Sequence, residues 1–475
     1  MGILETFLLV LLTGPAIFFI ILVYVLAAFG KTLGFRKKYV ELLLKLFEYG
    51  RERIEVAARK RERKNGGGND EDEEEEIFDD ASSEDSNEKG DLIQESPVPS
   101  EKQTQEIASE PVPSEIHDFQ DSFDFISSGI RAIVNDQVTQ RFASEELRSW
   151  NLLTRTTKNY EFISWRLSLI WVIGTIIRYA FLLPFRVTIC FLGTLTLTAL
   201  TFIIGLLPQC QFRKRLNDHA SKFCFRLLSR AFSAIITYHN EEYRPTKNGI
   251  CVANHTSPID VVLLACDSTY ALIGQSHGGF LGILQRALGR ASSHIWFERS
   301  EMKDREAVAR RLRKHVEDES TCPVLIFPEG TCINNSAVMQ FKKGSFEVGG
   351  LIYPVAIKYD PKFGDPFWDS SKYSMLQYLY MMMTSWAIVC DVWYLPPMSR
   401  KPGESSIDFA KRVKAVIARQ GGLIDLDWDG QLKRAPAKKE WMEQQQVQYA
   451  KKLVNTTPRH NIVSSTDESS PNPST

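Results

Sequence analysis

The chain has 475 residues, with 57 lysines and arginines against 58 acidic residues, and a formal net charge of −1. Its eight cysteines include no C-x-x-C pair, and a chain of this length needs no disulfide framework to fold. We therefore expect reduced thiols in a reducing compartment and neither a disulfide scaffold nor a structural zinc site.

The first predicted element is an apolar run from Phe7 to Phe29. It matches the roughly 20 residues that cross a hydrocarbon core. Glu5 is the one side-chain charge before it, whereas basic residues follow it from Lys31 to Lys38. A secretory signal has the opposite flank and a shorter core. The sequence therefore predicts an uncleaved membrane anchor over residues 1–30, with its basic flank in the cytosol.

The next segments alternate between polar and amphipathic composition. A basic helical segment is expected over residues 31–65. Residues 66–120 begin with three consecutive glycines, followed by an acidic run and a stretch rich in Ser, Pro and Glu, which predicts a disordered linker. Apolar residues return at helical spacing afterwards, so amphipathic helices are expected over residues 121–163.

A second apolar region follows over residues 164–210. Its two halves are separated near Pro184, and the first half carries Arg178, which is costly inside a membrane. The pattern favours a helical hairpin that dips into or through the membrane. A buried pair of core helices is the alternative.

Residues 211–440 alternate short apolar runs with helical patterns. Strands are expected at 249–254, 321–327, 351–357 and 387–395, with a helix over 303–318. Such alternation is typical of an α/β domain with a central sheet. The Met- and aromatic-rich run at 375–390 is interpreted as core or as membrane-facing. Residues 441–475 are expected to be the end of a C-terminal helix and a disordered tail.

The first of these strands leads into Asn254-His255-Thr256-Ser257-Pro258-Ile259-Asp260. Ser257 suits the N-cap of a helix, Pro258 its first position and Asp260 its third. His255 then lies just outside the helix, and Asp260 can turn back toward it. A carboxylate on one imidazole nitrogen fixes the tautomer and makes the other nitrogen a better base. This predicts a catalytic pair, although a capped helix with a satisfied histidine explains the spacing equally well.

Two later segments carry residues suited to a phosphate ester. Ile295-Trp296-Phe297-Glu298-Arg299 places an arginine after a short apolar run, and Phe327-Pro328-Glu329-Gly330-Thr331 closes a strand with an acid and a glycine. Lys342 and Lys343 follow. Arginine binds phosphate through parallel hydrogen bonds, and lysine adds a fixed cation. Glu329 can orient Arg299 or bind hydroxyls, and Gly330 permits close approach of the backbone.

In these segments the chain resembles the glycerophospholipid acyltransferase family. NHTSPID, WFER, FPEGT and the stretch Tyr353-Pro354-Val355-Ala356 look like the family's four blocks, in the family's order. Residues 134–155 and 418–425 resemble a narrower branch, the endoplasmic-reticulum-type glycerol-3-phosphate acyltransferases that form the third and fourth animal members. The second block departs from the commoner form by carrying Glu298 before Arg299, which bears on acceptor preference.

The resemblance implies an acyltransferase fold with a mixed central sheet. It also implies transfer of an acyl group from acyl-CoA to the sn-1 hydroxyl of glycerol 3-phosphate, which gives lysophosphatidic acid for glycerolipid and triacylglycerol synthesis. His255 would be the base and Asp260 its partner. The residues implied to bind the glycerol phosphate are Phe297, Arg299, Glu329, Gly330 and Thr331. Pro354 would lie on the acyl-donor side.

The thioester is already activated, so neither a metal nor another cofactor is expected. The expected partners are acyl-CoA, glycerol 3-phosphate and the lipid bilayer, with no nucleic acid, and a homo-oligomer stays open. The expected location is the endoplasmic reticulum membrane with the active site facing the cytosol, and lipid droplets as a second location.

Three alternatives remain at this stage. A lysophosphatidate acyltransferase uses the same chemistry on another acceptor. A catalytically inactive membrane or lipid-droplet adaptor would keep the fold alone. A metal-dependent hydrolase would need further ligands near His255, for which His277 and His294 are candidates by their closeness in sequence.

Overall fold

The computed structural model describes residues 3–31, 34–65, 129, 138–145, 147, 150–153, 164–246, 248–276, 278–297, 305–433, 443 and 447. The chain divides into two compact units, Met1–Val98 with Arg141–Gln431 and Pro99–Gln140 with Leu432–Thr475. The few described residues of the second unit are helical. The linker predicted over 66–120 and most of the segments at 121–163 and 441–475 lie outside the described residues.

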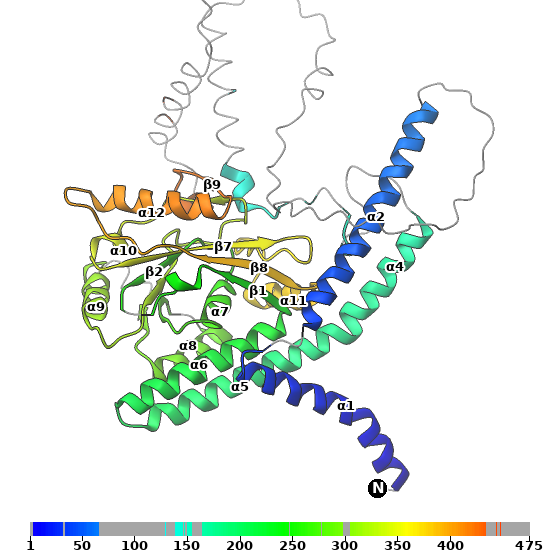
Figure 1. Cartoon of the computed structure of the whole chain (residues 1–475), viewed down its shortest axis with the longest axis horizontal. Coiled ribbons are helices and arrows are strands. Elements are labelled where there is room, and N and C mark those ends of the chain that lie inside the picture. Colours follow the sequence, from blue (N-terminus) through cyan, green and yellow to red (C-terminus); the bar gives the residue numbers. More distant parts are fainter. Residues whose placement is uncertain are drawn as a thin grey trace, which may run out of the picture. The chain divides into compact units, whose positions relative to one another are not determined.

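The first unit is built on a seven-stranded sheet with the order β1-β8-β7-β2-β5-β3-β4. Figure 1 labels β1, β8, β7 and β2 of this sheet. Strands β7 and β8 are antiparallel, and every other neighbouring pair is parallel. The strands are β1 (Ala234–His239), β2 (Ile250–Ala253), β3 (Ala271–Gln275), β4 (Ile295–Phe297), β5 (Val324–Ile326), β7 (Ile352–Asp360) and β8 (Ile388–Tyr394). A small parallel pair joins β6 (Ala337–Val338) to β9 (Ile424–Asp425). The predicted mixed central sheet is confirmed.

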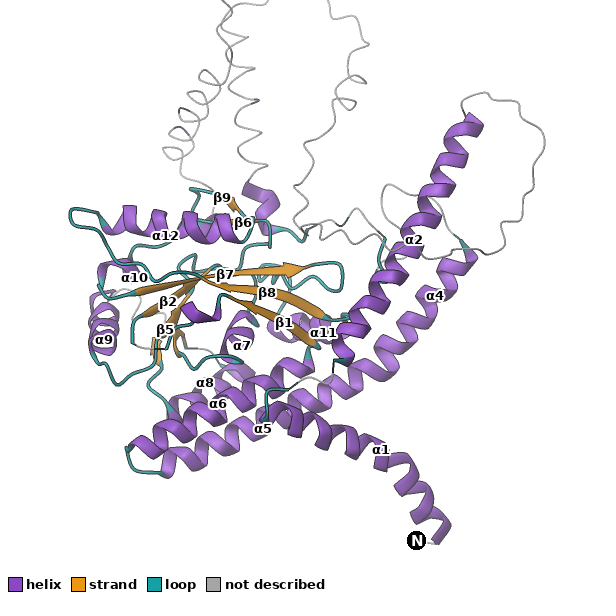
Figure 2. Cartoon of the chain, viewed as in Figure 1, coloured by secondary structure: helices purple, strands orange, loops and turns teal. Residues whose placement is uncertain are grey.

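Helices cover both faces of this sheet (Figure 2). Because side chains alternate along a strand, Ile250 and Val252 of β2 enter one core while Cys251 and Ala253 enter the other. The first core is completed by α9 (Arg305–Glu317), α10 (Gly344–Glu347) and α12 (Ser406–Gln420), and the second mainly by α7 (Asp260–Ala265) and α11 (Met375–Thr384). Beyond α7 lie α6 (Gln211–Ala231) and α8 (Gly279–Ala291). Short 3₁₀ turns occur at Gln140–Phe142, Glu241–Tyr243 and Gly430–Lys433.

The apolar region at 164–210 forms one continuous helix, which corrects the predicted hairpin. Helices α4 (Trp165–Ile176) and α5 (Leu183–Leu206) are joined by the π-helical segment Ile177–Leu182, and together they make a helix of 42 residues. The N–H of Leu183 donates to the carbonyl of Arg178, five residues back. This wider turn makes room for the ring of Pro184 and needs no N–H from it, so the proline does not end the helix.

Two arginines of this long helix are buried against the domain. Arg186 is 1% exposed and donates to the carbonyls of Met383, Ser385 and Trp386, at the end of α11. Arg178 donates to the carbonyl of Thr384, with a nitrogen–oxygen distance of 2.6 Å. The guanidinium groups therefore donate to carbonyls at the C-terminus of α11 and in the two residues after it, of which Trp386 also accepts from the hydroxyl of Tyr39.

Helices α1 (Ile3–Ala28) and α2 (Phe35–Asn65) also precede the long helix. Helix α1 packs its C-terminal part on α5 and α6, where the Tyr24 hydroxyl lies 2.8 Å from Thr196 Oγ1. Helix α2 matches the predicted basic helical segment. Its Gly50 lies against the Trp150 ring, since an added Cβ would be 2.1 Å from Trp150 Cε3. By length and composition, Trp165–Leu206 is the described helix long and apolar enough to cross a membrane.

Candidate active site

The turn after β2 brings His255 and Asp260 into contact. His255 Nδ1 lies 2.9 Å from Asp260 Oδ2, and the same oxygen accepts the backbone N–H groups of Thr256 and Ser257 at 2.9 and 3.0 Å. Since Oδ2 is an acceptor, Nδ1 carries the hydrogen and Nε2 is left as the basic nitrogen. The contact predicted from the sequence is present in the structure.

The start of the helix differs from the prediction. Helix α7 begins at Asp260, with Ile259 at its N-cap. The N–H of Ile259 donates to Ser257 Oγ at 3.3 Å, so Ser257 caps the turn that leads into the helix. The Ser257 hydroxyl also lies within hydrogen-bond distance of the hydroxyl of Tyr378 on α11. The carboxylate of Asp260 adds to this capping, because it accepts the N–H groups of Thr256 and Ser257 in the turn before the helix.

The surroundings of His255 raise its pKa. Burial alone lowers the pKa of this imidazole, but the adjacent Cys332 and the hydrogen-bonded Asp260 outweigh burial and hold it well above 6.5. An imidazole with a raised pKa is a stronger base once it has lost its proton.

The Nε2 edge of His255 faces the segment that follows β5. Cys332 Sγ lies 3.5 Å from Nε2, and the Phe327 ring stacks on the imidazole with its centroid 4.2 Å away. The backbone N–H of Ile333 also donates to the His255 carbonyl at 2.8 Å. These contacts join the FPEGT segment to the NHTSPID segment. The side chain of His255 remains 18% exposed, so its outer edge is open to a substrate.

Glu329 has a clear structural role in this arrangement. It is 1% exposed, and its two carboxylate oxygens accept the backbone N–H groups of His255 at 2.8 Å and Met339 at 2.9 Å. Burial raises the pKa of Glu329 to about 8 despite these donors. The carboxylate thus fixes the main chain of His255. Its predicted contact with substrate stays a prediction.

The other predicted ligands that the structure describes, Phe297, Gly330 and Thr331, lie at or after the carboxyl ends of parallel strands. Phe297 is the last residue of β4, which runs parallel to β3, β5 and β2. Strand β4 is three positions away from β2 in the sheet, so the two strands are roughly 14 Å apart at the usual strand spacing. Arg299 lies outside the described residues. Gly330 has φ +70°, and an added Cβ there would be 2.9 Å from Lys342 Nζ. Thr331 packs its methyl group against Gly430.

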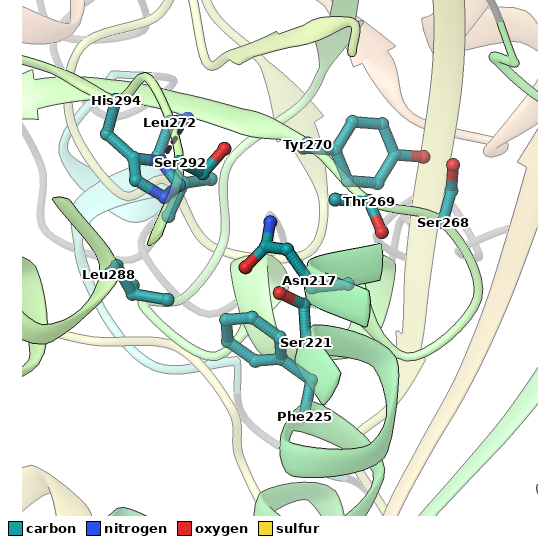
Figure 3. A pocket seen from close by; sticks show the side chains of 11 residues that line it. Asn217, Ser221, Phe225, Ser268, Thr269, Tyr270, Leu272, Leu288, Ser292 and His294 are labelled. Carbon is teal, nitrogen blue, oxygen red and sulfur yellow. Dashed lines mark hydrogen bonds between the residues drawn. The ribbon is translucent and has the colours of Figure 1, made fainter. Parts of the chain in front are cut away.

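A small cavity seen in Figure 3 lies at the opposite edge of the sheet, near Tyr270 and His294, which precede β3 and β4. Its volume is about 10 Å³, room for one water molecule at most. His294 Nδ1 accepts the N–H of Leu272 at 2.9 Å, and burial lowers the pKa of this imidazole to about 4. His294 therefore cannot join His255 in one metal site, while His277 lies outside the described residues.

Comparison with known proteins decides the family. Residues 235–358 match the family named Acyltransferase. The chain is 50% identical to the zebrafish (Danio rerio) protein named glycerol-3-phosphate acyltransferase 3-like over 438 residues. These residues are 92% of this chain and 94% of that protein. The chain belongs to the glycerol-3-phosphate acyltransferase family.

Mammalian members of the family are similar to the same degree. Mouse glycerol-3-phosphate acyltransferase 4 is 49% identical over 445 residues, which are 92% of this chain and 93% of the mouse protein. Human glycerol-3-phosphate acyltransferase 3 is 50% identical over 430 residues, 90% of this chain and 93% of the human protein. A crystal structure of the 1-acyl-sn-glycerophosphate acyltransferase from Thermotoga maritima aligns with a TM-score of 0.38 and 19% identity, over 57% of this chain and 99% of that chain.

Three contacts of the site were not predicted from the sequence. Phe327 stacks on His255, Cys332 faces Nε2, and the hydroxyl of Tyr359 donates to Asp260 Oδ1. All three residues stand inside or next to the recognised blocks. Their contacts depend on how parallel strands place distant segments at one sheet edge, which no local spacing reports.

Proposed function

We propose that the chain transfers an acyl group from acyl-CoA to the sn-1 hydroxyl of glycerol 3-phosphate and releases lysophosphatidic acid. The observation that carries this proposal is the His255–Asp260 pair, joined to the FPEGT segment, in a chain about half identical to curated glycerol-3-phosphate acyltransferases.

In the proposed mechanism His255 Nε2 accepts the proton of the acceptor hydroxyl while its oxygen attacks the thioester carbonyl. The tetrahedral intermediate then expels the CoA thiolate, which takes the proton from Nε2. Asp260 keeps the ring in the productive tautomer and stabilises the imidazolium that forms between these steps. The contact of Cys332 with Nε2 would be exchanged for the acceptor hydroxyl.

We assign the acceptor phosphate to the side of the FPEGT turn, where Arg299 and Lys342 would supply the positive charge. Lys342 Nζ lies over Gly330, whereas Lys343 is held by Glu347 at 2.8 Å. Gly330 has a left-handed backbone conformation, which favours glycine, and glycine places no side chain on this turn.

The Lys342→Gln variant should raise the KM for glycerol 3-phosphate about tenfold with little change in kcat, because it removes a charge-assisted contact formed before and during reaction. Initial rates over a range of acceptor concentrations measure this. Lys343→Gln is the matched control, since the neighbouring lysine is occupied by Glu347. Equal KM values for the two variants would contradict the assignment of Lys342 to the phosphate site.

We further propose that the apolar faces of α1, α4, α5 and α11 contact a bilayer. The helix of 42 residues is about 63 Å long, roughly twice the ~30 Å hydrocarbon core, so it fits a tilted or interfacial position. Exposed apolar residues along these helices include Phe18, Phe181, Phe191, Leu206, Leu376 and Tyr380.

An endoplasmic reticulum membrane with the site on the cytosolic side, and lipid droplets as a second location, fit acyl-CoA as a cytosolic donor. Asn254 supports this orientation. It belongs to the glycosylation sequon Asn254-His255-Thr256, yet it is 2% exposed and its amide pairs with both backbone groups of Ile357. A glycan on this asparagine would be incompatible with the fold.

Labelled acyl-CoA offered to the purified chain with either glycerol 3-phosphate or lysophosphatidate tests the proposed acceptor. We expect labelled lysophosphatidic acid from the first acceptor and a much lower rate with the second. Turnover of lysophosphatidate alone would assign the chain to the rival activity, and turnover of neither acceptor would favour the adaptor.

A further inference from the structure

Asp260 is held from two sides. Its Oδ2 accepts His255 Nδ1–H and two backbone N–H groups, all from the turn in which it stands. Its Oδ1 accepts a hydrogen bond from the hydroxyl of Tyr359, at the C-terminal end of β7 and 99 residues away along the chain. Asp260 is fully buried and Tyr359 is 2% exposed, so bulk water does not compete for either oxygen.

From this geometry we infer that Tyr359 is a positioning residue for the His255–Asp260 pair: its hydroxyl holds the second carboxylate oxygen so that the first one points at the imidazole. The inference rests on the proposed function, since it assigns Tyr359 a part in the same proton transfer. Tyr359 does not reach substrate and acts through Asp260.

The backbone of Tyr359 is fixed as firmly as its hydroxyl. Its N–H donates to Asn335 Oδ1 at 2.9 Å, and its carbonyl accepts from Asn335 Nδ2 at 2.8 Å. Asn335 follows the FPEGT turn in the chain, so the segment that contacts His255 also fixes the position of the Tyr359 backbone. A tyrosine held at both ends can define one carboxylate rotamer, because moving the carboxylate would break a buried hydrogen bond.

The hydrogen bond from the hydroxyl of Tyr359 also partly neutralises the negative charge of the Asp260 carboxylate. Without that donor, more of the charge would be directed at the imidazolium, which would then be held more tightly. The titratable groups that face Tyr359 are Asp260 on α7, Tyr378 on α11 and Cys390 on β8. The titratable groups that face His255 are Asp260, Cys332 and Glu329. Asp260 is the one group common to both sets.

The test compares Tyr359→Phe with Tyr394→Phe in the full chain, using labelled acyl-CoA and glycerol 3-phosphate. Tyr394 is an equally buried tyrosine of the same sheet, and its hydroxyl donates to Asp267 at 2.9 Å, away from the pair. We expect Tyr359→Phe to lower kcat about tenfold at nearly constant KM, and to move the acidic limb of the pH profile of kcat/KM to higher pH. Tyr394→Phe should leave kcat and the profile as in the unmodified chain.

A second substitution covers the case in which Tyr359→Phe folds poorly. Incorporation of 3-fluorotyrosine at position 359 keeps the ring and makes the hydroxyl a stronger donor, so the acidic limb should move to lower pH. If the two phenylalanine variants lose the same activity and neither substitution at position 359 moves the limb, Tyr359 has only a structural role. An unmodified chain that acylates neither acceptor would instead refute the proposed function, which separates the two failures.

Discussion

His255→Ala should lower kcat for acylation of glycerol 3-phosphate by about 10²–10⁴-fold, because it removes the group that takes the hydroxyl proton in the transition state. The KM for acyl-CoA should change little, since the imidazole contributes to the chemical step rather than to donor binding. Steady-state rates with labelled acyl-CoA measure both quantities.

The chain contains a matched control for this variant. His239 at the end of β1 also pairs with an aspartate, since its Nε2 lies 2.8 Å from Asp391 Oδ1. Strand β1 lies beyond β8 and β7 from β2, and it runs antiparallel to β2, so this second pair is at the other edge of the sheet. His239→Ala should keep its activity. Unchanged turnover in His255→Ala would refute the assignment of the base.

Arg186→Met should destabilise the fold by about 2–5 kcal/mol, the largest stability effect expected for these variants. Methionine keeps an apolar stem of similar shape but leaves the carbonyls of Met383 and Ser385 without their arginine donor, and each unsatisfied buried group costs about 1–3 kcal/mol. The carbonyl of Trp386 keeps its second donor, the hydroxyl of Tyr39. Thermal unfolding of the detergent-solubilised chain, followed by intrinsic fluorescence, measures the loss.

Arg215→Met is the control for Arg186→Met. Arg215 is exposed on α6, so the same substitution there should change stability by no more than about 0.5 kcal/mol. Similar melting temperatures for the two variants would show that the long helix does not depend on its arginine contacts with α11.

The sequence predicted the fold where the signal was local. Strands β2, β5, β7 and β8 are compact apolar runs, and each was expected at nearly its observed position. Strand β1 was missed because it is a half-exposed edge strand in which Thr237 faces solvent. The helix break predicted near Pro184 was wrong, because a π-helical turn accommodates the proline ring.

Arg178 was interpreted as a cost inside lipid because its partners are remote in sequence. It binds Thr384, 206 residues away, and no periodicity in either segment reports that contact.

The same division applies to the candidate site. His255 and Asp260 are five residues apart in one turn, so helix-start chemistry alone suggested their contact. Tyr359 on β7 and Glu329 in the turn after β5 bind this pair, and their hydrogen bonds are set by the register of β2 with β7 and β5. Glu329 was predicted as a substrate ligand, whereas in the structure both of its oxygens are bound to backbone N–H groups.

The pH dependence of kcat/KM in Asp260→Asn tests most directly whether His255, held by Asp260, is the base. In the unmodified chain activity should fall as the pH drops through the raised pKa of His255, because a protonated imidazole cannot accept the hydroxyl proton. The variant loses the carboxylate charge that helps raise this pKa, so its acidic limb should move to lower pH while its maximal rate falls. An acidic limb at the same pH in both proteins would contradict the account.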